Sequence, residues 1–174
     1  NNRIIYIGRI DNNAKNLDQL VKASKKARVI VDIAGRGDKK TLLKSLSEEE
    51  KNYVNFLGQY PNNEIPKLLS QYEYFVLPSN YEGNPKSLLE AMSCGKVVIG
   101  SDVLGINNII EDKVNGLLCR PSVESISDTI RFALKNPELC KKLKKNARNF
   151  ILENYSLDKV IAKEIAIYKK LLQH

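Results

Sequence analysis

The chain alternates short apolar runs with amphipathic helical patterns over most of its length. The runs that we expect to form strands are Ile4–Ile7, Val29–Ala34, Val54–Leu57, Glu73–Leu77, Val97–Ile99 and Leu117–Cys119. The helices expected between them are Leu17–Ala27, Lys39–Leu46, Glu64–Gln71, Pro85–Ser93 and Ile106–Glu111. Several strands are continuous apolar runs, which is typical of strands buried on both faces of a parallel sheet. The sequence therefore predicts an α/β fold: a Rossmann-like, doubly wound parallel sheet of about six strands with helices on both faces.

The last third of the chain differs, with three consecutive helices expected at Val123–Leu134, Pro137–Leu152 and Leu157–Leu172. The final helix carries one apolar stripe, so it can cover this sheet or reach another domain. A length of 174 residues suits a single domain with a full core. Because the chain starts at Asn1 and its only methionine is Met92, we expect it to be a piece of a longer protein.

Composition narrows the class of protein. Hydrophobic residues make up 43% and charged residues 28% of the chain, as in soluble globular domains. The cysteines are odd in number and widely spaced, which predicts a reducing, cytoplasmic setting and no disulfide framework: Cys94, Cys119 and Cys140. The only histidine is His174, so catalytic triads and histidine metal sites are not expected.

Part of the net charge of +8 is concentrated in the second of the three C-terminal helices and just before it. We interpret these cations as a solvated helix face, and contact with an anionic membrane or an acidic partner stays open as an alternative. Nucleic acid is not expected, since no aromatic platform accompanies the charge. The cations are Lys135, Lys141, Lys142, Lys144, Lys145 and Arg148.

Ligands of open α/β sheets bind beyond the carboxyl ends of the strands, so the loops there are the candidate site. Two glutamates, Glu82 and Glu90, bracket one such loop and the start of the next helix. We expect Asn84 as N-cap and Pro85 as first helical residue, leaving backbone N–H groups of Lys86 and Ser87 for an anion. Carboxylates beside a phosphate site suit sugar or ribose hydroxyls, although two unrelated surface carboxylates would give the same spacing.

The first loop, Gly8–Lys15, contributes two cations. Arg9 and Lys15 converge on one site if the loop folds back, and two fixed cations neutralise a departing diphosphate. Surface cations of a basic protein are the alternative. The loop at Gly35–Gly37 reads as a tight turn, and Gly58–Gln59 as a plain turn or a contact for a nucleobase.

Taken in order, these motifs resemble family four retaining glycosyltransferases. The resemblance runs through Gly8-Arg9…Lys15-Asn16, Phe56-Leu57-Gly58, Pro78-Ser79…Glu82-Gly83-x-Pro85 and Leu89-Glu90-Ala91-Met92-x-Cys94-Gly95. Three positions depart from the family pattern: Asn84 stands where the family often has a bulky apolar or another small residue, Leu104 replaces a glycine, and Asn108 replaces an acid.

The resemblance implies a GT-B enzyme in which this chain is the C-terminal, donor-binding half and a missing N-terminal domain binds the acceptor. It implies that Arg9 and Lys15 hold the donor diphosphate, and that Glu82 contacts the transferred sugar. It further implies that Glu90 binds the ribose, and that Gly58 and Gln59 lie at the edge of the nucleobase. The remaining residues implied at the sugar and phosphates are Gly8, Gly83, Asn84, Lys86, Ser87 and Leu88.

We therefore expect a retaining glycosyltransferase domain with Arg9, Lys15 and Glu82 as catalytic residues and no metal or other cofactor. The expected donor is a UDP-, GDP- or ADP-sugar. The expected acceptor is a sugar or lipid-linked molecule in polysaccharide, lipopolysaccharide or glycolipid synthesis. The setting would be the cytoplasm or the inner face of a membrane, and the isolated piece would be inactive. A sugar-nucleotide epimerase of the same fold and a non-catalytic sugar-nucleotide-binding module are the alternatives.

Overall fold

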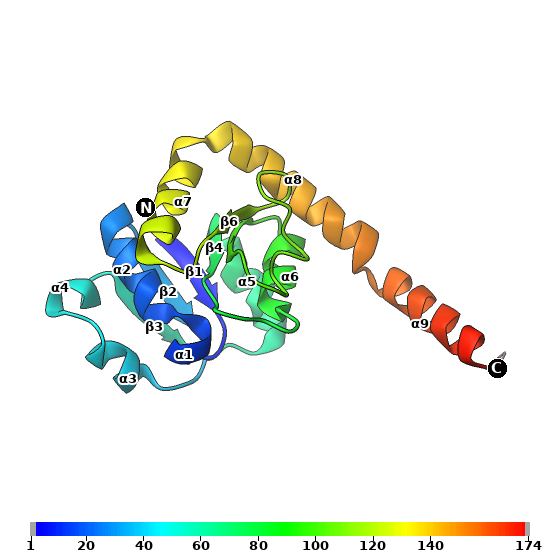
Figure 1. The fold of residues 1–174 in the computed structure, drawn as a ribbon, viewed down its shortest axis with the longest axis horizontal. Helices are drawn as coiled ribbons and strands as arrows, with labels where there is room; N and C mark the ends of the chain where they lie inside the picture. Colours follow the sequence, from blue (N-terminus) through cyan, green and yellow to red (C-terminus); the bar gives the residue numbers. More distant parts are fainter. Residues whose placement is uncertain (1–2, 173–174) are drawn as a thin grey trace.

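The computed structural model describes residues 3–172, apart from the side chain of Lys163 (Figure 1). Its sheet has six parallel strands in the order β3-β2-β1-β4-β5-β6. This order, in which the chain builds outward from β1 to one edge and then from β4 to the other, is the Rossmann arrangement. The strands are β1 Arg3–Ile7, β2 Ile30–Ala34, β3 Val54–Gly58, β4 Tyr74–Leu77, β5 Val97–Ser101 and β6 Leu117–Cys119.

Helices cover both faces of the sheet (Figure 1). The helix Leu17–Ala27 packs against the first of the three C-terminal helices, and the helix after β4 packs against the second. The expected fold class, with its three C-terminal helices, is confirmed. The helices are α1 Asn12–Lys15, α2 Leu17–Ala27, α3 Lys39–Lys44, α4 Glu48–Lys51, α5 Ile65–Ser70, α6 Lys86–Ser93, α7 Val123–Lys135, α8 Pro137–Asn154 and α9 Leu157–Leu171, with a 3-10 turn at Asn62–Glu64.

The centre of the sheet is buried on both faces. Phe75 and Val76 of β4, and Val98 and Ile99 of β5, are adjacent pairs that point to opposite faces, and all four are fully buried. Burying a side chain of this kind contributes about 1.5–3 kcal/mol. The continuous apolar runs thus correctly predicted strands enclosed between two helical layers.

The helix expected at Ile106–Glu111 is wrong, because turns occupy this segment. The backbone makes isolated helical bonds here, such as Ile110 N–H to Ile106 O at 2.9 Å, but does not propagate them. The Ile106 and Ile110 side chains fold over Gly100 of β5, where an added Cβ would lie only 2.5 Å from Ile106. Tertiary packing against a glycine therefore sets this backbone, a contact that periodicity does not reveal.

Two one-turn helices were not expected. In α4, Ser47 and Glu50 form a reciprocal capping box, and in α1 the Asp11 carboxylate accepts the Ala14 N–H at 3.2 Å. Caps of this kind satisfy the free N–H groups of even a single turn. The Ser-x-x-Glu spacing around α4 was a signal available in the sequence.

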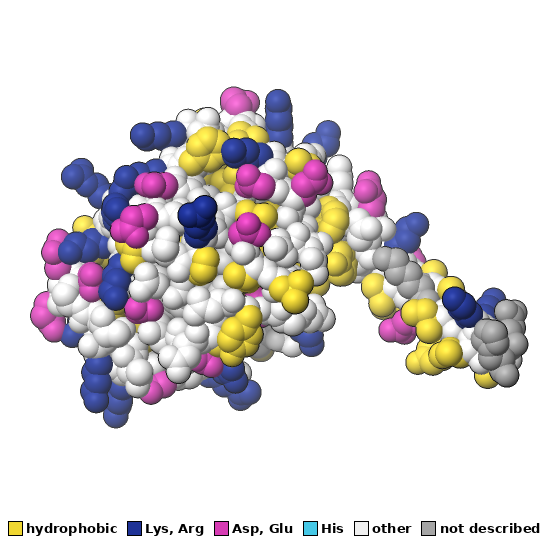
Figure 2. Space-filling view, viewed as in Figure 1, with side chains coloured by type: hydrophobic (Ala, Val, Ile, Leu, Met, Phe, Trp, Pro, Cys, Tyr) yellow, Lys and Arg dark blue, Asp and Glu magenta, His cyan; other side chains and the backbone are white. Residues whose placement is uncertain are grey.

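Helix α9 extends away from the body of the molecule (Figure 1), and Figure 2 shows apolar side chains along it. Seven of its large apolar side chains are exposed: Leu157, Val160, Ile161, Ile165, Ile167, Tyr168 and Leu171. The helix therefore does not cover its own sheet, which was one of the two expectations.

Several cations of α8 have partners within the chain. Lys144 pairs with Glu73 at 2.7 Å, Lys141 pairs with Glu138 at 2.7 Å, and Arg148 donates to a backbone carbonyl of α6. Exposed pairs of this kind contribute little to stability. Exposed ion pairs and hydrogen bonds are typical of a solvated helix face, so these contacts support that interpretation of the basic helix.

A buried carboxylate lies in the sheet away from the loops expected to form the site. Asp32 of β2 is completely buried and accepts hydrogen bonds from the Tyr72 hydroxyl at 2.6 Å and the Asn55 amide at 2.9 Å. The Arg3 guanidinium lies 2.5 Å from the same carboxylate. A charge buried this fully is tolerated because its partners replace the lost water.

We expect Arg3→Met to lower the free energy of unfolding by about 1.5–3 kcal/mol, the usual worth of a hydrogen bond to a charged group. Lys25→Met is the matched control, because it breaks an exposed ion pair with Glu49 and should cost less than about 1 kcal/mol. Urea unfolding of both variants measures the difference. Equal losses would contradict a special role for the buried carboxylate.

Candidate functional site

The order of the strands reverses between β1 and β4. The register between β1 and β2 covers five residue pairs, from Arg3↔Ile30 to Ile7↔Ala34. The register between β1 and β4 covers only two, Ile4↔Tyr74 and Ile5↔Phe75. The two central strands therefore stop pairing before their carboxyl ends. Open α/β sheets bind their ligands at such a reversal.

A cavity of about 420 Å³ occupies this position. It is lined by the diverging ends of β1 and β4, the loops that follow them and the start of α6: Tyr6, Ile7, Gly8, Arg9, Lys15, Asn62, Leu77, Glu82, Asn84, Pro85, Lys86, Ser87 and Glu90. A second cavity of about 250 Å³ shares Gly8, Arg9, Asn62 and Glu90 with it. That cavity extends toward β2 and β3 through Gly35, Arg36, Gln59 and Tyr60. We call these two cavities together the groove.

Most of the residues expected at the site line this groove. Three do not. Leu88 has a fully buried side chain, and its N–H donates to Pro85 O at 2.9 Å. Gly58 lines neither cavity, and its carbonyl accepts the Gly35 N–H at 2.7 Å. Gly83 lies between two lining residues and has open space around it.

Glu82 is joined to the first loop by an ion pair. The Lys15 Nζ donates to Glu82 Oε1 at 2.7 Å, across 67 residues of sequence, and both side chains are largely buried. The Ser79 hydroxyl donates to the same oxygen at 2.7 Å. The candidate cation and the candidate sugar-contacting acid thus form one charged unit, bridging the loops after β1 and β4.

Arg9 is held differently. Its guanidinium pairs with Asp11 at 3.0 Å and remains mostly exposed, while its carbonyl accepts the Tyr6 hydroxyl at 2.8 Å. Burial raises the pKa of Tyr6 far above its ordinary value, so the hydroxyl keeps its proton and donates. Helix α1 folds the loop back, so that Arg9 and Lys15 both line the groove.

Close backbone contacts fix the first loop. Gly35 and Gly37 lie at φ +146° and +144°, where an added Cβ would be 1.8 Å from the Gly8 carbonyl oxygen and 2.2 Å from that of Ile10. This approach lets the Ile10 N–H donate to Arg36 O at 2.8 Å. The two glycines, expected only to form a tight turn, therefore position the loop that carries Arg9.

The start of α6 differs from the expectation by one residue. The helix begins at Lys86, and Pro85 occupies the capping position with ψ 77°, so Asn84 is not the N-cap. The Lys86 N–H donates to Asn84 O at 2.9 Å, so the prediction of a free N–H there is wrong. Within the described chain the Ser87 N–H has no partner. Asn84 precedes a proline, which disfavours helical backbone and explains the turn.

Glu90 lies in the next turn of α6. Desolvation raises the pKa of its carboxyl above the ordinary value of 4.5, and neighbouring Lys86 partly lowers it again. The side chain nevertheless remains exposed, so its carboxylate is open to hydroxyl donors of a ligand. Glu90 lines both cavities of the groove.

The loop of Glu82 is fixed from two further sides. Asn80 donates its N–H to Ala14 O at 2.9 Å and its side-chain amide to Asn13 O at 2.8 Å, which attaches the loop to α1. Gly105, at φ +90°, packs against the Glu82 carbonyl. Sequence patterns do not predict these contacts, since they join segments far apart in the chain.

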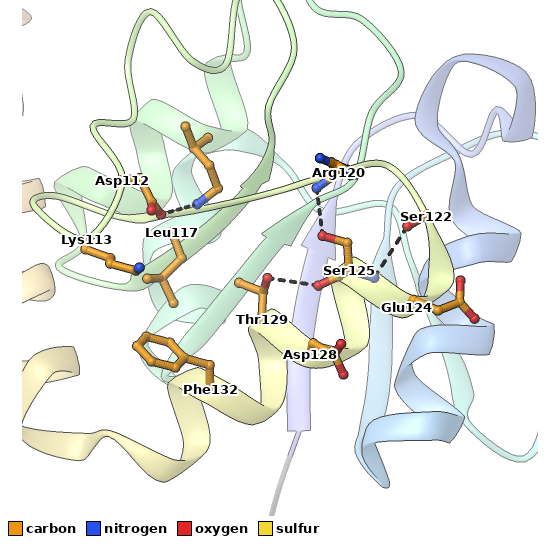
Figure 3. Close-up of a pocket in the computed structure, with 11 residues that line it drawn as sticks. Asp112, Lys113, Leu117, Arg120, Ser122, Glu124, Ser125, Asp128, Thr129 and Phe132 are labelled. Carbon is orange, nitrogen blue, oxygen red and sulfur yellow. Dashed lines mark hydrogen bonds between the residues drawn. The ribbon is translucent and has the colours of Figure 1, made fainter.

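A larger cavity of about 620 Å³ lies beside the edge strand β6 and α7 (Figure 3). Its polar groups are largely occupied by internal bonds. Asp112 accepts the Leu118 N–H at 2.9 Å, Ser125 Oγ accepts the Arg120 N–H at 2.9 Å, and Thr129 donates to the Ser125 carbonyl. The first of these bonds satisfies a backbone N–H of the edge strand β6, the second joins the end of β6 to α7, and the third lies within α7. The cavity thus has a structural explanation.

Other features do not add a site. Among residues 3–172, no group of three or more histidine, cysteine or acidic side chains is placed to hold a metal ion. The three cysteines are free thiols. None of the helices in the described part of the chain is both long and apolar enough to cross a membrane.

The geometry defines an α/β domain with a basic and acidic groove at the reversal point of its sheet. The family described as Glycosyl transferases group 1 matches residues 1–150, and the chain belongs to this family. An uncharacterized glycosyltransferase from Methanocaldococcus jannaschii is 30% identical, over 95% of this chain and 44% of its own length. Alpha-D-kanosaminyltransferase from Streptomyces kanamyceticus is 30% identical, over 80% of this chain and 37% of its own.

A solved structure of a Staphylococcus aureus TarM variant, in complex with fondaparinux, alpha-GlcNAc-glycerol and UDP, superposes with a TM-score of 0.83. It is 26% identical, and the match covers 96% of this chain and 35% of that one. The chain spans less than half the length of the curated relatives described above. The family likeness stated from the motifs is confirmed, and the chain is a glycosyltransferase domain.

We expect Gly105→Ala to displace the Glu82 loop and to lower the melting temperature, because the new Cβ would lie 2.1 Å from Glu82 O and the backbone is left-handed. Strain of this kind costs about 1–3 kcal/mol. Gly83→Ala is the control, since open space surrounds that position. Thermal unfolding compares the two variants, and an unchanged melting temperature for Gly105→Ala would show that the contact does not fix the loop.

Proposed function

We propose that this domain binds a nucleoside diphosphate sugar and, with an acceptor-binding domain outside this chain, transfers the sugar with retention of configuration. One observation carries the proposal: residues from three separate segments line one groove, with Arg9, Lys15, Glu82 and Glu90 around the start of α6. A diphosphate requires cations, whereas the hydroxyls of a sugar and a ribose require hydrogen-bond acceptors such as carboxylates. The groove offers both kinds of group side by side. A UDP-, GDP- or ADP-sugar is the class of donor that fits.

The diphosphate is assigned to Arg9, Lys15 and the start of α6. Arginine offers a planar fork and lysine a point charge, and the unpartnered N–H of Ser87 adds a donor. Lys86 and Ser87 also line the groove at this place. Negative charge grows on the leaving diphosphate as the sugar departs, so fixed cations stabilise the transition state more than the bound donor. No step in this scheme requires a metal ion.

The two glutamates take different roles. Glu82 precedes α6 and bonds Lys15, so it lies beside the bond between sugar and diphosphate, where positive character develops at the anomeric carbon. Glu90 lies four residues into α6, about 6 Å along its axis, on the side toward Gln59 and Tyr60. That position suits the ribose hydroxyls, with the base beyond them at Gln59.

The comparisons support this class of donor. The S. aureus TarM variant was solved with UDP, and alpha-D-kanosaminyltransferase is by name a sugar transferase. We assign this protein to polysaccharide, lipopolysaccharide or glycolipid synthesis in the cytoplasm, with a sugar or lipid-linked acceptor. Because the groove is open, we propose that the domain alone transfers no sugar until a second domain closes it and excludes water.

The direct experiment is a thermal-shift and calorimetry panel of UDP-, GDP- and ADP-glucose on this chain. One of them should raise the melting temperature, since a ligand that binds only the folded state stabilises it in proportion to its affinity. The double variant Lys15→Ala/Glu90→Gln should remove the shift. Absence of any shift from the whole panel would overturn the proposed function.

In the whole enzyme, we expect Arg9→Ala and Lys15→Ala to lower kcat by about 100- to 1000-fold, as loss of a well-placed electrostatic donor does. The donor KM should change much less. Lys67→Ala is the matched control, a lysine on α5 that does not line the groove. Steady-state kinetics tests this, and near-normal kcat in either variant would remove that residue from the diphosphate role.

We expect Glu82→Gln to lower kcat strongly and to leave the affinity for free nucleoside diphosphate intact. Glu90→Gln should weaken nucleotide binding by about 10- to 100-fold, the worth of a charge-assisted hydrogen bond. Calorimetry with the nucleoside diphosphate, together with turnover, separates the two. If Glu82→Gln weakened nucleotide binding and Glu90→Gln did not, the roles of the two glutamates would be reversed.

Glu90 also predicts a pH dependence. Ribose hydroxyls donate to the ionised carboxylate, so donor affinity should be complete above the raised pKa of Glu90 and fall as the pH drops through it. Calorimetry with the intact nucleotide sugar measures the profile. Glu90→Gln should flatten it, and an unchanged profile in that variant would place the titrating group elsewhere.

A further inference from the structure

Ser79 donates a hydrogen bond to the Glu82 carboxylate but lines neither cavity of the groove. Its side chain is completely buried two residues beyond the end of β4, and its hydroxyl donates to Glu82 Oε1 at 2.7 Å. Two other buried serines, Ser101 and Ser127, have hydroxyls without a partner in the described structure. The hydrogen bond from Ser79 to a carboxylate in the groove is therefore not shared by every buried serine of this chain.

The same carboxylate oxygen also receives Lys15, at 2.7 Å. Glu82 Oε2 has no partner among the described residues, so it is the oxygen left for a ligand. A diphosphate in the groove attracts the ammonium group of Lys15, whose long side chain moves easily. Serine has a short side chain, and Ser79 lies just beyond a central strand, so its bond persists when Lys15 turns to the phosphate.

We infer that Ser79 is a positioning residue that holds the Glu82 carboxylate in place while Lys15 engages the donor diphosphate. The inference rests on the proposed function of the groove. Before the donor binds, Lys15 and Ser79 together fix Oε1. After it binds, Ser79 alone keeps Oε2 directed at the sugar, so that catalysis does not depend on Lys15 serving two partners at once. Ser79 itself contacts neither the sugar nor the diphosphate.

The test compares Ser79→Ala, Ser79→Thr and the control Ser127→Ala in the whole enzyme. Ser127 is an equally buried serine on α7 that lines neither cavity of the groove, and its hydroxyl has no partner to lose within the described chain. We expect Ser79→Ala to lower kcat by about 10- to 100-fold, the effect of one hydrogen bond to a charged group, with an unchanged donor KM. Ser79→Thr, which keeps the hydroxyl, should recover most of the rate, and Ser127→Ala should match the wild type.

Wild-type kcat in Ser79→Ala would overturn the inference. So would a loss that Ser79→Thr does not recover and that comes with weaker binding of free nucleoside diphosphate, because that pattern indicates a structural role. A crystal structure of the Ser79→Ala variant, soaked with nucleoside diphosphate, tests the inference without an activity assay. Glu82 should leave its position there, and a carboxylate that stays in place would also overturn the inference. Failure of the wild type to bind any nucleotide would instead count against the proposed function.

Discussion

The separation of β1 from β4 is the constraint on which the site depends. In a parallel sheet each strand normally satisfies its neighbour's backbone along its whole length, yet here pairing between the central strands stops at Ile5 and Phe75. The chain builds outward from this line in both directions, so the loops after β1 and β4 are led apart to opposite faces. The gap between them admits a ligand without a hole in the core, because the fully buried residues of both strands lie below it.

A gap of this kind has to be held at a fixed width, and polar bonds between distant segments do so. Lys15 and Glu82 cross it directly, Asn80 joins the loop after β4 to α1, and close glycine contacts align the loop after β1 with the one after β2. The ion pair also keeps two charges satisfied in a partly buried place while no donor is bound. In the proposed function a diphosphate would replace one partner of that pair, so binding would exchange one charge contact for another rather than bury a new charge.

The fold was predictable because its strongest signals are local. Continuous apolar runs specify doubly covered strands, and their alternation with helices specifies the topology. The helix expected at Ile106–Glu111 failed because Gly100, on another strand, receives its isoleucines. The shift at Asn84 and Pro85 is local too, but it depends on the backbone angle of the proline. Glu82, Glu90, Arg9 and Lys15 could be selected by motif, whereas Tyr6, Ser79 and Gly105 act through contacts that spacing does not encode.

The central claim is that the donor lies in the groove between β1 and β4. A crystal structure of this chain with the nucleoside diphosphate selected by the binding panel tests it most directly. The account predicts the diphosphate between Arg9, Lys15 and the start of α6, the ribose at Glu90, and the Lys15 ammonium moved from Glu82 toward phosphate. A nucleotide seated instead in the cavity beside β6 and α7, with the Lys15–Glu82 ion pair untouched, would contradict it.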